Sequence, residues 1–126
     1  MIERIHPAGV PTPRAPYSPA VRAGNFIYVS GQGPIDPATN QFSLGTIEHE
    51  VHLVLSNIER ILAGCGATMK DVIKVNVYLR NGDDFQAMNG VFGQFFNEAK
   101  PARTTIECKF ANKEMKVEID CIAYKE

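Results

Sequence analysis

The chain has 126 residues, of which 44% are hydrophobic and 21% charged, and its formal net charge is −1. This length is typical of one domain, so we expect a single domain over residues 1–126. A near-neutral balance argues against nucleic acid as a partner, because binding a polyanion needs a basic patch. No apolar stretch reaches the ~20 residues of a membrane span, and the N-terminal residues lack a signal-peptide pattern, so we expect no membrane partner and a cytoplasmic location.

Cysteine and histidine usage gives no indication of a metal or a cofactor. Cys65, Cys108 and Cys121 form an odd set without a C-x-x-C pair, which favours reduced thiols. Cys108 and Cys121 fall at positions that we expect to face the core. The segment "EHEVH", with His49 and His52, does not match H-E-x-x-H, so no zinc site is predicted.

The N-terminal third is expected to be an arm followed by a hairpin. Five prolines in residues 1–19 favour an extended segment, with Tyr17 as a packed aromatic in its middle. The turn signal Gly24-Asn25 lies between two β-prone runs, which predicts a hairpin of residues 19–23 and 26–31. Residues 34–41 are rich in turn formers and are expected to form a loop.

Periodicity predicts two helices and a strand in the middle of the chain. Residues 46–63 carry an apolar face at helical spacing, with Thr46 as N-cap. Residues 71–81 alternate like a strand with one buried face. A second helix is expected over about 84–98, capped by Asp83 or Asp84. The predicted core positions of the strand are Ile73, Val75, Val77 and Leu79.

Two more strands are expected at residues 103–110 and 116–124, joined as a hairpin through "ANKEM". The order β-β-α-β-α-β-β favours an α+β fold, a mostly antiparallel sheet with two helices on one face. The other face is then left to water or another subunit. Alternation places Arg103, Thr105 and Glu118 together on the face away from the core. The expected core face of the first strand holds Thr104, Ile106, Cys108 and Phe110.

An arginine and a glutamate around one pocket are suited to a small acid. The Arg103 guanidinium can hold a carboxylate through two parallel hydrogen bonds. The Glu118 carboxylate can position water or transfer a proton. Taken alone, the pattern favours an ordinary cross-strand salt bridge, because such pairs are common on sheet surfaces.

Several segments, in order and spacing, resemble one family. They are "PYSPAVRAGNFIYVSGQGPIDP", "VIKVNVYLRNGDDFQAMNGVFGQFF", and "PARTTIE" followed by "VEIDCIA". Together they resemble the RidA (reactive intermediate deaminase, YjgF-type) family over residues 14–124. The resemblance implies a chorismate-mutase-like fold and a homotrimer with pockets between neighbouring subunits. It also implies hydrolysis of enamines and imines, such as 2-aminoacrylate and 2-imino acids, to 2-oxo acids and ammonia without a cofactor.

The same resemblance assigns roles to individual residues. Arg103 would bind the substrate carboxylate, helped by the backbone N–H of Thr105. Glu118 would position the attacking water, and Tyr17 would close the pocket. Three further pocket residues are implied: Ser30, Gly31 and Asn89.

Departures from the family pattern concern substrate preference more than reaction type. Thr105 stands where many members have cysteine, and Gly33 replaces a bulkier residue, which enlarges the expected pocket. The segment "FFNEAKPAR" is shorter than in some relatives. Two alternatives stay open from the sequence: an endoribonuclease or translation inhibitor, and a non-catalytic protein that binds small carboxylates. Another enamine substrate, such as 2-aminomuconate, is a variant of the first hypothesis.

Overall fold

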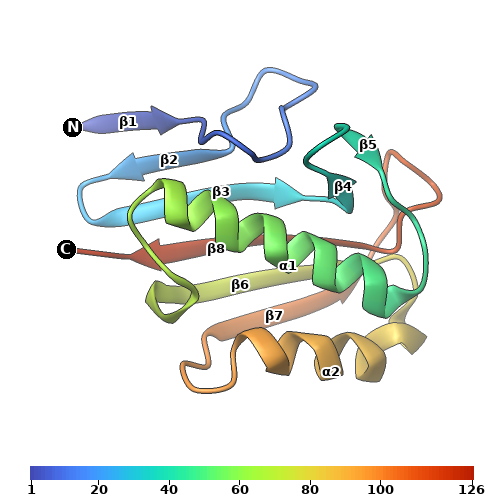
Figure 1. Ribbon diagram of the computed structural model, residues 1–126. Helices are drawn as coiled ribbons and strands as arrows, with labels where there is room; N and C mark the ends of the chain where they lie inside the picture. Colours follow the sequence, from blue (N-terminus) through green and yellow to red (C-terminus); the bar gives the residue numbers. More distant parts are fainter.

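The computed structural model describes all 126 residues and shows one six-stranded sheet with two helices on one face (Figure 1). The strand order is β1-β2-β3-β8-β6-β7, and every pair is antiparallel except β6 with β7. This confirms the α+β architecture expected from the sequence. The elements are β1 (Ile2–Ile5), β2 (Ala20–Ala23), β3 (Phe26–Gln32), β4 (Ile35–Asp36), β5 (Gln41–Phe42), α1 (Ile47–Gly64), η1 (Met69–Asp71), β6 (Val72–Leu79), η2 (Gly82–Asp84), α2 (Phe85–Phe95), β7 (Ala102–Glu107) and β8 (Val117–Tyr124).

Helix α1 begins and ends where the sequence predicts. The hydroxyl of Thr46 accepts a hydrogen bond from the backbone N–H of His49 at 3.1 Å, which satisfies one free donor of the first turn. After the last turn, Gly66 has a φ of 78°, a left-handed conformation that glycine adopts without a steric penalty. The apolar stripe of the helix then packs on β3 and β8.

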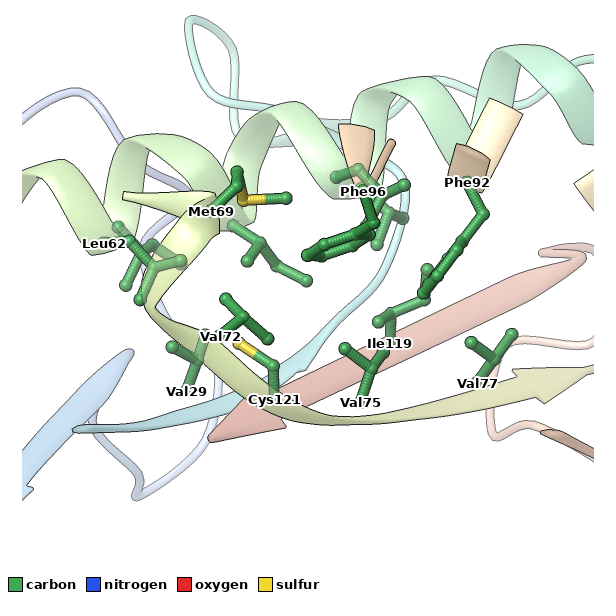
Figure 2. Packing of buried hydrophobic residues seen from close by; sticks show 14 of the residues in the cluster. Val29, Leu62, Met69, Val72, Val75, Val77, Phe92, Phe96, Ile119 and Cys121 are labelled. Carbon is green, nitrogen blue, oxygen red and sulfur yellow. The ribbon is translucent and has the colours of Figure 1, made fainter. Parts of the chain in front are cut away.

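The core fills the layer between the helices and the sheet, as Figure 2 shows. It contains 26 buried residues, to which β6 contributes Val75 and Val77 and α2 contributes Phe92 and Phe96. Cys121 of β8 is 2% exposed, and burial raises the pKa of its thiol to about 12. Its predicted place in the core is confirmed. No helix is both long and apolar enough to cross a bilayer.

Strand β6 departs from strict alternation at its first residues. Its register against β8 shifts between Val72 and Lys74, so one residue bulges out of the ladder. Ile73 is therefore 46% exposed, and Val72, which is 4% exposed, occupies the core position instead. The prediction that Ile73 faces the core was wrong because alternation assumes an unbroken register.

The predicted hairpin of the last two strands was also wrong. Strand β8 lies between β3 and β6, whereas β7 pairs in parallel with the other side of β6. The chain leaves β6 through α2 and returns in the same direction, as a parallel crossover requires. Residues 108–116 then form a connection rather than a tight turn, and β7 becomes the edge of the sheet.

Smaller corrections concern the connections. The expected loop at 34–41 contains one strand of the short β4–β5 hairpin and leads into the other. The side chain of Asn81, not of Asp83 or Asp84, caps the turn before α2, accepting from the N–H of Asp83 at 2.9 Å. Cys108 follows β7 and is half-buried, so it is not a core residue.

The sheet face opposite the helices carries uncovered apolar side chains. Phe26 and Tyr28 of β3 are 40% and 46% exposed, and Tyr124 of β8 is 40% exposed. Ile106 of β7 is 46% exposed on the same face, since its register partner is Tyr78. An open surface of this kind is characteristic of a protein interaction site.

A buried carboxylate ties α1 to the start of β8. Glu50 has no exposed surface, and its Oε1 accepts the backbone N–H of Lys116 at 2.7 Å. Its Oε2 accepts the N–H of Gly45 at 3.2 Å and lies 3.4 Å from Nζ of Lys116. The strand that carries Glu118 is therefore positioned by a fully hydrogen-bonded acid within the protein.

We expect Glu50→Leu to lower the free energy of unfolding by about 1–3 kcal/mol, because it removes the acceptor shared by the backbone N–H groups of Gly45 and Lys116. Urea denaturation at one fixed protein concentration measures the loss. Glu48→Leu is the matched control, because Glu48 is an exposed acid in the same turn. Equal losses for the two variants would show that Glu50 contributes only a helix-end charge.

Candidate active site

Glu118 lies beneath a bulge in β3. The register of β3 against β8 shifts between Val29 and Gln32, and Ser30 and Gly31 occupy the irregular stretch. A Cβ built on Gly31 would lie only 3.0 Å from the carboxyl carbon of Glu118. The absence of a side chain at Gly31 therefore makes room for this carboxylate.

The bulge also positions the segment that carries Tyr17. The Ser30 hydroxyl donates to the carbonyl of Ser18 at 2.6 Å, and the Ser30 N–H donates to the carbonyl of Pro19 at 3.0 Å. Tyr17, two residues before Pro19, is 49% exposed rather than packed. Tyr17, Gly31 and Glu118 line one cavity of about 170 Å³. The structure thus brings these three predicted site residues together. Ser30, expected to line the pocket, is not among the cavity's lining residues and instead bonds to the segment that carries Tyr17.

Two effects raise the pKa of the Glu118 carboxyl above its ordinary value. The larger is burial, and the second is the negative charge of Asp120 on the same face of β8. Asp120 accepts from Nδ2 of Asn76 and from the hydroxyl of Tyr78, both at 2.9 Å. The hydrogen bond from the Tyr78 hydroxyl to Asp120 is the main cause of the raised pKa of Tyr78. A carboxyl that gains a proton more readily is suited to act as a general acid and base.

Arg103 projects from β7 on the helix side of the sheet. Its guanidinium carbon lies 4.8 Å from the ring centroid of Phe92 and 5.6 Å from that of Phe85, both on α2. Nη1 lies 3.9 Å from Sδ of Met88. No carboxylate pairs with this guanidinium, and burial lowers its pKa. A charge held among apolar groups without a counter-ion is a ready site for an anion.

Two buried oxygens without a hydrogen-bond partner lie on β7 and α2, the strand and helix on either side of the Arg103 guanidinium. Oγ1 of Thr105 on β7 and Oδ1 of Asn89 on α2 are buried and have no hydrogen-bond partner. They are the only buried side-chain polar atoms in the structure without one. Such an atom costs about 1–3 kcal/mol when it stays unpaired, so the pair indicates a missing polar partner.

The prediction that Arg103 and Glu118 share one face was wrong for a single chain. Arg103 is the register partner of Val75, which faces the helices. Glu118 is the partner of Tyr78, which faces the opposite side. Two assumptions caused the error. The expected hairpin placed β7 beside β8, and alternation assumed that the apolar residues of β7 face the core, whereas in this edge strand they lie on the uncovered face. The structure therefore contains two half-sites, one around Glu118 and one around Arg103.

Two residues of the Glu118 half-site were not predicted. Asp120 follows Glu118 by two positions in "VEIDCIA", and period-two alternation places both on one face, but it gave Asp120 no role. Arg14 lines the cavity of Glu118 from the proline-rich arm, where no periodic signal exists. The structure has no cluster of three or more histidine, cysteine or carboxylate side chains placed to hold a metal ion.

Comparisons with known proteins agree on one family. The family model described as Endoribonuclease L-PSP matches residues 8–125. A RutC family protein of Pyrococcus horikoshii is 45% identical over 126 residues, which is all of both chains. A protein of the mite Dermatophagoides farinae named 2-iminobutanoate/2-iminopropanoate deaminase is 40% identical over 116 residues, covering 92% of this chain and 91% of that protein. The crystal structure of RidA from an Antarctic Psychrobacter matches with a TM-score of 0.91 at 34% identity, covering 97% of this chain and 98% of that one.

Proposed function

The chain belongs to the Endoribonuclease L-PSP family, which includes the RidA/YjgF-type proteins, and from this membership we propose that it hydrolyses reactive enamines and imines. Its substrates are 2-aminoacrylate and 2-imino acids, and its products are 2-oxo acids and ammonia. One observation carries the proposal: the half-buried Arg103 has no counter-ion, while the Glu118 carboxyl has a raised pKa. Hydrolysis of a small imino acid needs a cation that binds its carboxylate and an acid–base group that acts on water and nitrogen.

Each half-site performs one part of the reaction. Arg103 binds the substrate carboxylate through two parallel N–H donors, and the unpartnered oxygens of Thr105 and Asn89 extend the polar wall. Glu118 takes a proton from water as the water oxygen bonds to C2 of the imine. It returns this proton to nitrogen, which gives a carbinolamine. Glu118 then transfers the hydroxyl proton to nitrogen, the C–N bond breaks as the C=O bond forms, and ammonia and the 2-oxo acid depart. An enamine first becomes the imine by gaining a proton at C3 and losing one from nitrogen.

The two half-sites face opposite sides of one chain, so we propose that a second copy completes the pocket. The uncovered face with Phe26, Tyr28, Ile106 and Tyr124 supplies apolar area for such an assembly. Strand β7, at the edge of the sheet, carries Arg103 to the border of the chain. A homotrimer with pockets between neighbouring subunits fits this arrangement, with Arg103 from one subunit and Glu118 and Tyr17 from the next.

We expect Arg103→Ala to lower kcat/KM by about 100-fold or more, because the substrate loses both charge pairing and orientation. Arg103→Lys should recover only part of the loss, because an ammonium cannot form the two parallel bonds. An amino-acid oxidase generates the 2-imino acid, and semicarbazide traps what the protein has not hydrolysed.

Arg60→Ala is the control, since Arg60 is exposed on α1 and bonds to Asn57. The deaminase proposal fails if the wild type does not reduce semicarbazone formation, or if Arg103→Ala keeps full activity. Binding of a 2-oxo acid in calorimetry without turnover would instead support the non-catalytic alternative.

The pH dependence of kcat should report the charge of Asp120. That charge raises the pKa of Glu118, so Asp120→Asn should move the corresponding limb of the profile to lower pH. Burial remains in the variant, so the shift is partial. Tyr78→Phe is the control, because it removes a hydrogen bond but keeps the charge at Asp120. A limb that stays in place in Asp120→Asn would show that Glu118 does not control it.

A further inference from the structure

A second arginine lines the cavity of Glu118. Arg14 lies in the proline-rich arm, and its guanidinium carbon is 5.2 Å from the ring centroid of Phe42. One of its Nη atoms donates to the backbone carbonyl of Asn40. No carboxylate pairs with it, so its remaining N–H donors are free for a ligand.

The cavity extends from Glu118 to Arg14. At one end Gly31 lies against the carboxyl of Glu118. Farther along β3 and its continuation, a Cβ built on Gly33 would lie 3.6 Å from the ring of Phe42 and 3.4 Å from Sδ of Met115. A larger side chain at Gly33 would project into this space, so its absence leaves the path to Arg14 open.

These positions define what the cavity accepts beyond the reacting atoms. The α-carboxylate of an imino acid binds Arg103 in the proposed reaction, and Glu118 acts at C2. The remaining cavity of this chain is then the space available to the side chain of the substrate. At the cavity's exposed rim the guanidinium of Arg14 lies over the ring of Phe42, which favours this position for the charge. A planar guanidinium with free donors matches a carboxylate.

We propose that Arg14 makes this protein selective for 2-imino acids whose side chain ends in a second carboxylate. The inference rests on the proposed deaminase function and adds its substrate class. Gly33 provides the room for the longer side chain, and Arg14 provides the charge that binds its end. A substrate whose side chain is neutral and of the same size forms no ion pair with Arg14.

The test compares two substrates of equal size and different charge. An oxidase acting on aspartate or on asparagine generates 2-iminosuccinate or its side-chain amide, and semicarbazide competition gives kcat and KM for each. We expect the wild type to favour the dicarboxylate by about tenfold or more in kcat/KM. Arg14→Gln should reduce this ratio by about tenfold, mainly through KM, and Arg14→Lys should keep part of it.

Gly33→Ile provides a second variant that does not alter charge. It should lower kcat/KM for both longer substrates relative to 2-iminopropanoate, whose methyl side chain does not reach Arg14. Arg60→Ala is the control for loss of an unrelated arginine and should leave every ratio unchanged.

The outcomes separate this inference from the deaminase proposal. If the wild type hydrolyses both substrates equally, or if Arg14→Gln lowers both rates by the same factor, the role of Arg14 is wrong and the deaminase function stands. If the wild type hydrolyses neither substrate nor 2-iminopropanoate, the proposed function itself fails.

Discussion

The parallel pairing of β7 with β6 is the constraint on which the candidate site depends. It makes β7 an edge strand and directs Arg103 toward α2, away from the face that carries Glu118. Had β7 paired with β8 as a hairpin, the two charges could have met across the strands and neutralised each other. Their separation keeps the guanidinium without a counter-ion and keeps the carboxyl in an environment that raises its pKa.

Both half-sites hold groups in states that are unfavourable for the isolated chain. Thr105 and Asn89 each bury an oxygen without a partner, and burial raises the pKa of the Glu118 carboxyl. The core of 26 residues and the Glu50 anchor offset these costs elsewhere in the fold. Strain of this kind is typical of places where a ligand supplies the missing interaction. Here the proposed ligand carries one carboxylate for Arg103 and a second for Arg14.

Local patterns in the sequence predicted much of the fold. The capping by Thr46, the apolar stripe of α1 and the hairpin of β2 and β3 are confirmed because each depends on neighbouring residues. The order of β6, β7 and β8 depends on contacts distant in the chain, and alternation carries no information about it. At an edge strand such as β7, apolar residues can lie on the uncovered face, so the face of Arg103 was misassigned.

The sequence indicated candidate site residues but not their geometry. Resemblance to a family pointed to Arg103 and Glu118, and alternation placed Asp120 on the face of Glu118 without giving it a role. Arg14 lacked any signal because an irregular arm has no period from which to infer direction. The division into half-sites became visible only from the register of the sheet. The proposed reaction then requires that Arg103 and Glu118 act together from different copies.

Subunit complementation tests this requirement most directly. Arg103→Ala and Glu118→Gln variants, each of low activity alone, are unfolded, mixed in equal amounts and refolded together. Random reassembly places an intact Arg103 opposite an intact Glu118 at about a quarter of the subunit boundaries. We therefore expect the mixture to recover about a quarter of wild-type 2-imino-acid hydrolysis. A mixture no more active than the two variants measured separately would show that no pocket is shared between copies.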